Sequence, residues 1–317
     1  MKKFLSALFA VAAFVSAPHA TALEIFACEP EWGALAKELG GERVSIYVAT
    51  TAFQDPHRIQ AKPSLLARAR RADLVVCTGA ELEVGWLPLV LRQSGNDKIQ
   101  PPKPGYFEAA SYVQRLEVPT TLDRAAGDIH AAGNPHIQTD PRNIRRVAPA
   151  LAQRLAQLDP ASAEYYQARY SDFAKRWDAA IEKWTSEAAP LKDVPIVVHH
   201  RAFAYLENWL GLREVAQLEP KPGVEPTSSY LAQVLEQIAR QPAKMILRFP
   251  YNDERPSAWL AQRAKIPAIV LPGTVGGSDK AKDLFGLFDD TVQRLLEALR
   301  CAGTHKCREK QDAGSDR

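Results

Sequence analysis

Residues 161–188 read ASAEYYQARYSDFAKRWDAAIEKWTSEA, and this stretch decides how the rest of the chain is arranged. Its large apolar residues recur at intervals of three and four, the period of one helical face: Tyr166, Tyr170, Phe173, Trp177, Ile181 and Trp184. At about 1.5 Å per residue the helix would extend roughly 40 Å. An aromatic stripe at this spacing is typical of a core-facing side. We therefore expect one long helix that supports two lobes.

Segments with strand and helix character alternate on both sides of this stretch. Before it, apolar or β-branched runs predict strands at residues 23–28, 43–48 and 72–77, with weaker signals near Ile99 and at 113–118. After it, strands are expected at 195–199, 213–217, 244–247 and 268–271. Strands separated by helices form parallel sheets. The predicted fold class is therefore α/β, with two lobes, each a mainly parallel β-sheet flanked by helices, joined by a long linking α-helix.

The first residues are typical of a secretory signal. Lys2 and Lys3 precede an apolar run at residues 4–15, and Ala20-Thr21-Ala22 matches the small-residue cleavage pattern. The run is too short to span a bilayer, a retained anchor being the alternative, and no other segment approaches that length. We expect export to the periplasm without stable membrane insertion. The expected divisions are a signal peptide at 1–22, an N-terminal lobe at 23–140, linking helices at 141–190, a C-terminal lobe at 191–300 and a polar tail at 301–317.

Charge and cysteine content narrow the class of protein further. The formal net charge is +3, and basic residues are interspersed with acidic ones, which argues against a nucleic-acid partner. Export permits disulfides. Cys28 and Cys77 each end a predicted strand, and Cys301 and Cys307 lie close together in sequence, so the pairs Cys28–Cys77 and Cys301–Cys307 are expected. Residues 25–28, IFAC, faintly resemble a lipoprotein box, which is the alternative for Cys28.

Three histidines lie where a predicted strand or loop ends. They are His57 in DPH, His136 in NPH and His200 in VVHH. Parallel α/β sheets bind ligands beyond the carboxyl ends of their strands, so histidines of two lobes can meet in one cleft. Neutral imidazole is the commonest protein ligand for a borderline cation such as Zn²⁺. Alone, each would more simply be an exposed loop residue or a buried core residue; their shared context predicts a metal site.

The other histidines give weaker indications of function, and common enzyme motifs are missing. His199 points to the opposite face from His200 if the strand continues, so it belongs to the core or supports the site. His130 could supply a fourth nitrogen, whereas His305 lies in the polar tail. The sequence contains no HExxH, GxSxG or P-loop motif, so we expect no enzyme. A zinc hydrolase with three histidines and an activated water is the alternative from that class.

A series of short motifs runs in order along nearly the whole mature chain. In the first lobe these are Gly40-Gly41-Glu42, Asp55-Pro56-His57, Pro63-Ser64, and Ala72-Asp73-Leu74-Val75-Val76 with Gly79. In the middle they are Asn134-Pro135-His136, Asp140-Pro141-Arg142-Asn143, and Leu158-Asp159-Pro160 with Tyr166. In the second lobe they are His200-Arg201-Ala202-Phe203, Tyr205-Leu206, Leu210-Gly211-Leu212 and Glu225-Pro226. This ordered set resembles the zinc- and manganese-specific, ZnuA/TroA-like solute-binding proteins of bacterial ABC importers.

The resemblance implies a high-affinity, monomeric zinc receptor that delivers Zn²⁺ to a membrane permease. His57 and His136 match the ligands of the first lobe, and His200 matches the histidine of the second. Manganese members resemble this pattern but carry a carboxylate at the position of His200, so three imidazoles favour Zn²⁺. Manganese or another divalent metal is the alternative cargo, and an adhesin or metal chaperone the alternative role. The identity of the permease stays open.

The chain departs from the family pattern in three places. The usual fourth ligand is an aspartate after the last strand of the second lobe, but residues 270–277 contain no acid. Water, Asp279, Glu225 or His130 could take that position. Arg201 stands where an aspartate is common, and a cation there calls for a partner such as Glu225 or Asp253. The His-rich loop of many zinc members is missing, since residues 120–133 carry only His130.

Overall fold

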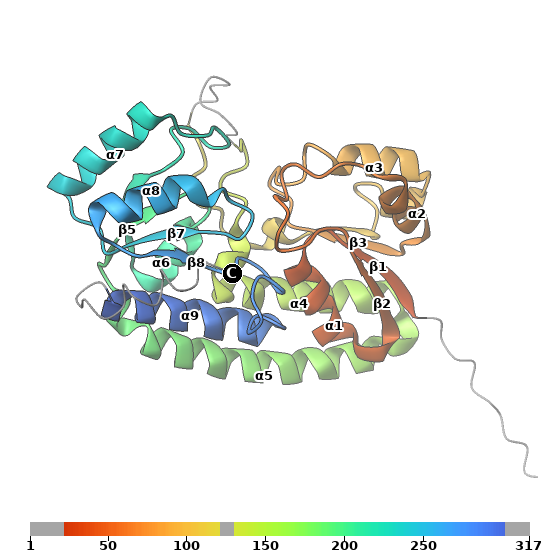
Figure 1. Cartoon of the computed structure of the whole chain (residues 1–317). Helices are drawn as coiled ribbons and strands as arrows, with labels where there is room; N and C mark the ends of the chain where they lie inside the picture. Colours follow the sequence, from red (N-terminus) through yellow and green to blue (C-terminus); the bar gives the residue numbers. More distant parts are fainter. Residues whose placement is uncertain (1–21, 121–129, 302–317) are drawn as a thin grey trace, which may run out of the picture.

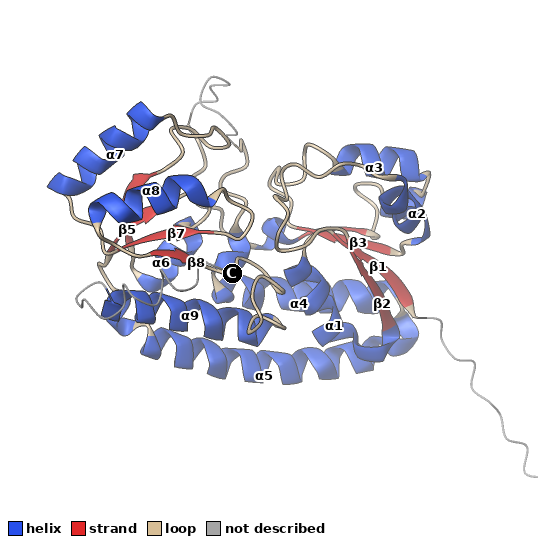
Figure 2. Cartoon of the chain, viewed as in Figure 1, coloured by secondary structure: helices blue, strands red, loops and turns tan. Residues whose placement is uncertain are grey.

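Two lobes stand side by side on a base of long helices in the computed structural model of this chain, which describes residues 22–120 and 130–301 (Figure 1). The strands lie inside each lobe with helices packed around them (Figure 2). The predicted α/β class with two lobes and a long helix is confirmed. The expected signal peptide and Cys307 fall outside the described residues, apart from Ala22. Within the described ranges, no helix combines the length and apolar character needed to cross a bilayer.

The first lobe is a four-stranded sheet in the order β2-β1-β3-β4, with every neighbouring pair parallel. Helix α1 begins at Pro30, a residue favoured in the first helical turn because its fixed φ suits the helix and its missing N–H has no partner to lose. In chain order the elements are β1 (Leu23–Ala27), α1 (Pro30–Gly40), β2 (Val44–Val48), α2 (Pro63–Arg71), β3 (Leu74–Cys77), α3 (Leu87–Ser94) and β4 (Tyr106–Glu108).

Both faces of this sheet are covered, which explains why its strands are continuous apolar runs. Ile25 of β1 faces α1, whereas its neighbour Phe26 packs on the opposite face with α2 and α3. Cys28 and Cys77, at the ends of neighbouring strands, form a disulfide with Cα atoms 4.8 Å apart. That pair is confirmed, and the disulfide leaves the Cys28 sulfur unavailable for a lipid. The expected Cys301–Cys307 pair involves a residue outside the described ranges.

The second lobe repeats the same strand pattern. Its sheet has the order β6-β5-β7-β8, again with parallel neighbours throughout. In both lobes the first strand is therefore central, and the segments that follow its carboxyl end and that of the second strand open toward the space between the lobes. The elements are β5 (Pro195–Val198), α6 (Ala204–Leu210), β6 (Arg213–Gln217), α7 (Ser228–Arg240), β7 (Met245–Arg248), α8 (Glu254–Ala264), β8 (Ala268–Val270) and α9 (Leu284–Cys301).

Helices α4 (Pro141–Leu158) and α5 (Ala163–Glu187) form the base that carries both lobes. The aromatic stripe of α5 is core, as predicted: Phe173 and Trp177 are fully buried and pack against α9 through the ring of Phe285. One apolar cluster continues from the first sheet through α4, α5 and α9 to the second sheet. The linking helices are thus part of a shared core.

Two of the weaker strand predictions were wrong. Ile99 lies in a 3-10 turn, and residues 113–118 form no strand. The edge strand of the first lobe is instead Tyr106–Glu108, three residues long and paired with β3. It follows Pro101, Pro102 and Pro104, whose missing N–H groups interrupt any longer ladder in this region.

Candidate metal centre

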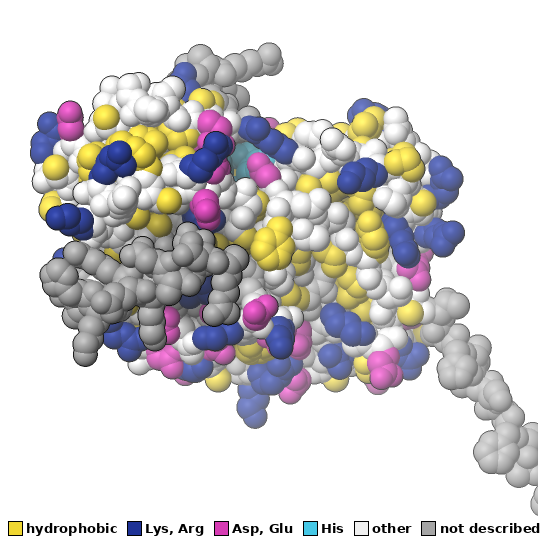
Figure 3. All heavy atoms as spheres, in the orientation of Figure 1, with side chains coloured by type: hydrophobic (Ala, Val, Ile, Leu, Met, Phe, Trp, Pro, Cys, Tyr) yellow, Lys and Arg dark blue, Asp and Glu magenta, His cyan; other side chains and the backbone are white. Residues whose placement is uncertain are grey.

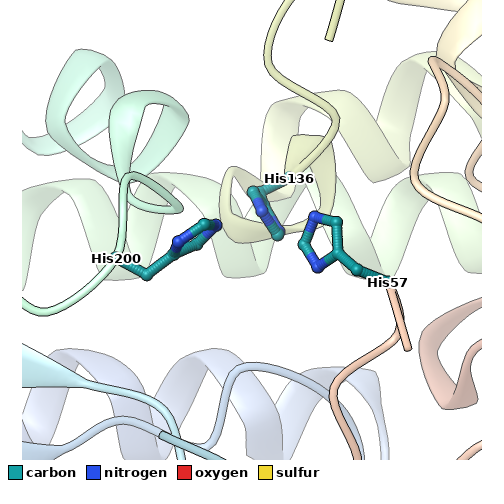
Figure 4. A group of neighbouring side chains, drawn as sticks. All are labelled: His57, His136 and His200. Atoms are coloured by element: carbon teal, nitrogen blue, oxygen red, sulfur yellow. The ribbon is translucent and has the colours of Figure 1, made fainter. Parts of the chain in front are cut away.

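The structure brings His57, His136 and His200 together between the lobes. One ring nitrogen from each lies within 4.8 Å of the others, and the three ring centroids are 5.2 to 5.6 Å apart. The rings point toward one another from three separate chain segments (Figure 4). Histidine atoms are visible at the bottom of the hollow between the lobes, flanked by charged side chains (Figure 3).

His57 is held by the residue two positions before it. Asp55 accepts hydrogen bonds from the His57 backbone N–H (3.0 Å) and from His57 Nδ1 (2.7 Å). Burial acts to raise the pKa of Asp55, but its hydrogen bond to His57 outweighs this and holds that pKa below its ordinary value. Since a carboxylate only accepts, His57 is protonated on Nδ1 and presents the Nε2 lone pair. Nε2 is buried and has no partner among the described residues.

His200 is held in the same way from a different element. It follows β5, and its Nδ1 donates to Glu219 Oε2 over 2.7 Å. Glu219 lies beyond β6 and also accepts from the backbone N–H of Gly223 (2.8 Å). Carboxylates behind metal-binding imidazoles fix the tautomer and raise the basicity of the ligand nitrogen. Asp55 and Glu219 therefore prepare two Nε2 atoms, one on each lobe, for the same point in space.

His136 is the most deeply buried of the three, with 1% of its surface exposed. An Asx turn positions it: Asn134 Oδ1 accepts from the His136 backbone N–H over 3.0 Å. Neither of its ring nitrogens has a hydrogen-bond partner in the part of the chain that the structure describes. Burial, followed by the nearby His57 and His200, holds the pKa of His136 well below its ordinary value. An imidazole in this position stays neutral and offers its lone pair to a cation.

A short chain of contacts joins the two carboxylate-supported histidines across the cleft. Arg58, next to His57, donates from Nη2 to the carbonyl oxygen of Gly223 over 2.9 Å. The N–H of Gly223 in turn donates to Glu219, the partner of His200. The loop after β6 thus contacts the first-lobe loop and the second-lobe histidine at once. Glu219, which holds His200, is thus linked through Gly223 to the first-lobe loop that carries His57.

The four candidates for a fourth ligand have different positions. Asp279 and Glu225 are exposed, and neither belongs to the group of ligand atoms formed by the three histidines. Glu225 acts electrostatically on Arg255 instead. His130 lies beside the cluster, with its ring stacked on that of His57 at 5.3 Å between centroids. Water is the remaining candidate.

The expected partners of Arg201 were wrong. Its guanidinium pairs with Glu117, at 2.7 Å from Nη2 to Oε1, and not with Glu225 or Asp253. Asp253 pairs with Arg255. Asn134 joins the same contact, donating from Nδ2 to Glu117 and to the Arg201 carbonyl oxygen. The positive charge beside His200 is thereby neutralised by an acid that also holds the turn before His136.

Sequence reasoning did not identify the two carboxylates that hold the rings of His57 and His200. Asp55 stood in the quoted DPH motif, and Glu219 follows the predicted strand at 213–217, so both had the signal of an acid at a strand or loop end. The sequence did not indicate which acid would form a hydrogen bond with which histidine. His199, expected in the core or as a support, is buried with its Nε2 4.0 Å from Glu219 Oε1.

The donor set has a clear chemical preference. Zn²⁺ binds imidazole nitrogen at about 2.0–2.1 Å, which separates the nitrogens of a tetrahedral site by roughly 3.3 Å. The three nitrogens lie within 4.8 Å, so small side-chain rotations reach that separation. Three imidazole nitrogens suit a borderline cation better than a hard one, which prefers oxygen.

Comparison with known families agrees with this geometry. Residues 25–298 match the family model described as the periplasmic component A of the zinc-uptake complex. The high-affinity zinc uptake system protein ZnuA of Brucella abortus is 26% identical over 165 residues, 52% of this chain and 48% of that protein. The chain thus spans about half the length of these curated zinc-uptake relatives.

Two further relatives match over nearly their full length. The manganese ABC transporter substrate-binding lipoprotein PsaA of Streptococcus anginosus is 22% identical, with 93% of this chain and 96% of that protein covered. A solved crystal structure of ZnuA superposes with a TM-score of 0.69 at 21% identity, covering 89% of this chain and 99% of the other. At this identity the structural likeness supports the fold.

Proposed function

Because the chain belongs to the family of periplasmic zinc-uptake components A, we propose that it is a periplasmic receptor that captures a divalent metal ion and passes it to an ABC-type importer. The observation that carries this proposal is the cluster of His57, His136 and His200, whose ring nitrogens meet between the lobes. The ion is cargo and not a resident cofactor. We propose a binding protein, not a hydrolase.

Zn²⁺ is the proposed cargo. Three imidazoles form the cluster, and two of them present Nε2 because a carboxylate holds Nδ1. A manganese ion would bind these three imidazoles weakly, since it favours carboxylate, carbonyl and water oxygens. Manganese remains the second candidate because a manganese-binding relative matches almost the whole chain. The donor chemistry ranks it below zinc.

We propose that the fourth position is taken by water or by His130. His130 has its ring against that of His57, on the side of the cluster where a further nitrogen could approach. Asp279 and Glu225 are exposed and remain candidates only if their loops move on metal binding. A His130→Ala variant that loses about tenfold in zinc affinity would support the histidine; unchanged affinity would assign the position to water.

Delivery to the permease is expected to involve small movements. The apolar core shared by α4, α5, α9 and both sheets resists wide opening, so the lobes cannot swing apart without exposing buried side chains. The segments free to move are the loops that carry His57 and Glu219. We propose that the permease releases the ion by displacing these loops, which would turn His200 away from the cluster.

The test is metal content by mass spectrometry on protein purified without added metal. The parent should carry close to one zinc per chain, and His57→Ala/His136→Ala/His200→Ala should carry none. Gln60→Ala, an exposed change in the loop of His57, is the matched control and should keep its zinc. Zinc retained by the triple variant would move the site elsewhere, and a parent that stays empty after zinc addition would remove the function.

Competition between metals then decides the cargo. Chelator-treated protein titrated with Zn²⁺ in excess Mn²⁺ should bind zinc at nearly the affinity measured without manganese. Tight Mn²⁺ binding that zinc does not displace would assign manganese. A deletion strain that fails to grow under zinc limitation, and is rescued by the parent and not by the triple variant, would separate transport from an adhesive role.

A further inference from the structure

A narrow cavity lies between the lobes, apart from the histidine cluster. First-lobe residues Glu29 and Glu31 line one side, and second-lobe residues Tyr251 and Thr274 line the other. Gln138, of the 3-10 turn Ile137–Thr139 that follows His136, also lines it. Neither glutamate belongs to the group of ligand atoms that the three histidines form. The cavity is therefore a separate feature of the space between the lobes.

Two buried carboxyl groups line this cavity, and a third interacts with one of them. Glu29 is the N-cap residue of α1, although its side chain makes no capping hydrogen bond, and Glu31 lies in the first turn. Glu83, in the loop before α3, is also buried and acts electrostatically on Glu29. None of the ion pairs found among the described residues includes any of them. Burial raises the pKa of Glu31 and of Glu83 to about 7. Burial, together with the charges of Glu83 and Glu31, also raises the pKa of Glu29 well above its ordinary value.

Glu83 is satisfied by the backbone, but its two neighbours are not. Glu83 accepts from the N–H groups of Thr78 (2.7 Å) and Gly79 (3.1 Å). Glu29 Oε2 accepts from Thr78 Oγ1 over 3.1 Å and from the Thr78 N–H over 3.3 Å, and a side-chain hydrogen bond with Glu83 helps to raise the pKa of Glu29. Glu31 uses only Oε2, which accepts from Thr274 Oγ1 of the second lobe. One oxygen of each remains for another partner.

Those two oxygens, with a third from Gln138, are buried and unpartnered. Within residues 22–120 and 130–301, Oε1 of Glu29, of Glu31 and of Gln138 each lack a hydrogen-bond partner. These side chains are 4%, 1% and 7% exposed. An unpartnered buried polar atom costs about 1–3 kcal/mol, and native proteins rarely carry several at one place without an ion or water. Three oxygen atoms with free lone pairs line one cavity, which favours a cation as the occupant.

We propose that Glu29, Glu31 and Gln138 form a second, all-oxygen site between the lobes that takes a hard divalent cation of the calcium class. Two carboxylates and an amide oxygen are the ligands that such ions select, and water completes their coordination. Two carboxylates match the charge of a divalent ion, which removes the cost of burying both acids without a cation. Zn²⁺ would prefer the imidazoles nearby.

The site would also join the lobes. Glu31 belongs to α1 of the first lobe, and its other oxygen already accepts from Thr274, which follows β8 of the second lobe. A cation on Glu31 Oε1 keeps that carboxylate ionised and therefore strengthens the hydrogen bond from Thr274. Gln138 lies two residues from His136, so the cation would fix the turn that carries a zinc ligand.

Calcium titration of chelator-treated protein by calorimetry tests this site, with the histidine triple variant used so that the first site is absent. At about pH 8 the triple variant should bind one Ca²⁺ per chain, with Kd on the order of 10⁻⁴ to 10⁻³ M. Adding Glu31→Gln should weaken binding at least tenfold, and Glu29→Gln should do the same. Glu42→Gln removes an exposed carboxylate from the same lobe and should change nothing.

Two results would overturn the proposal. One is an absence of calcium binding, and the other is equal calcium affinity in the triple variant with and without Glu31→Gln; either would leave the cavity to water and protons. Glutamine copies the shape of a protonated glutamate, so calcium-free melting temperatures within a few degrees of the triple variant's show that the fold is kept. Because the histidines are already replaced, failure here leaves the proposed zinc function untouched.

Discussion

Two groups of buried polar side chains face the space between the lobes, and they differ in how they can exist without a ligand. The histidine cluster can hold a neutral ring at its most buried point, because burial keeps the pKa of His136 well below its ordinary value. The glutamate group can be neutral only by keeping protons that free carboxyls have lost. The two groups therefore suit different ions, and in metal-free protein their contributions to stability change in opposite directions with pH.

The largest expected effect is the loss of zinc affinity when the histidine cluster is removed and the glutamate group is kept. His57→Ala/His136→Ala/His200→Ala should lower zinc affinity at least about ten-thousandfold, roughly 5.5 kcal/mol, because all three protein ligands are lost. Glu31→Gln should leave zinc affinity within about threefold. Zinc titration of both variants against a competing chelator measures this. If Glu31→Gln costs as much zinc affinity as the triple variant, the two groups form a single site.

The disulfide should matter to the glutamate group more than to the histidines. Cys28 precedes Glu29, and Cys77 precedes Thr78, whose N–H donates to Glu29 and Glu83. A cross-link over 49 residues contributes about 4 kcal/mol through the unfolded chain. Cys28→Ala/Cys77→Ala should lose stability of that order in urea and weaken calcium binding, yet bind zinc within about threefold. Reducing the disulfide of the parent should have the same effects as the double variant, which controls for the loss of the two sulfur atoms. An equal loss of zinc affinity would contradict the separation.

Glu219 tests whether a carboxylate behind a histidine sets zinc affinity. Glu219→Gln removes the charge that orients His200 and raises its basicity, so zinc affinity should fall about 10- to 100-fold. Glu225→Gln, an exposed change a few residues away, is the matched control and should leave affinity unchanged. Isothermal titration in the presence of a competitor measures both. A comparable loss in Glu225→Gln would make Glu225 a ligand.

The smallest expected effect is the opposite pH response of the two groups in metal-free protein. Glu31 has its pKa raised from 4.5 to about 7, so the unfolded chain releases this proton first, and the free energy of unfolding falls as pH rises between those values. His136 has its pKa lowered, so it reduces stability as pH falls below 6.5. Glu31→Gln should flatten the decrease between about pH 5 and pH 8 by on the order of 1 kcal/mol. The free energy of unfolding is measured in urea at several pH values in that range. If it changes with pH equally in the parent and in Glu31→Gln, this prediction is wrong.

Much of the fold could be predicted because its signals are local. The spacing of Phe173 and Trp177 predicts a helical face, and apolar runs separated by helices predict parallel strands. The edge strand at Tyr106–Glu108 could not be predicted in the same way, because three residues near several prolines carry no period. Short edge strands form where a neighbouring strand offers its backbone, which is a property of the sheet and not of the segment.

The histidine cluster and the glutamate group also differ in how far they could be predicted from the sequence. The histidines could be predicted as candidates because each follows a strand or loop end, which parallel sheets turn toward a cleft. Glu29 and Glu31 flank Pro30 at a helix start, where acids are usually exposed and favourable to the helix dipole. Contacts between distant segments bury them instead: Glu31 accepts from Thr274 of the second lobe, and Glu29 accepts from Thr78. The contact between Glu31 and Thr274 joins residues 243 positions apart.

The apolar core that runs from one sheet through α4, α5 and α9 to the other has a consequence for cooperativity. Neither lobe can lose its structure without exposing side chains that also belong to the other, so the chain should melt in one transition and not lobe by lobe. An ion held between the lobes then stabilises every part of the molecule at once, by an amount set by its concentration and affinity. Resistance to proteases should therefore rise with the supply of any ion that binds between the lobes.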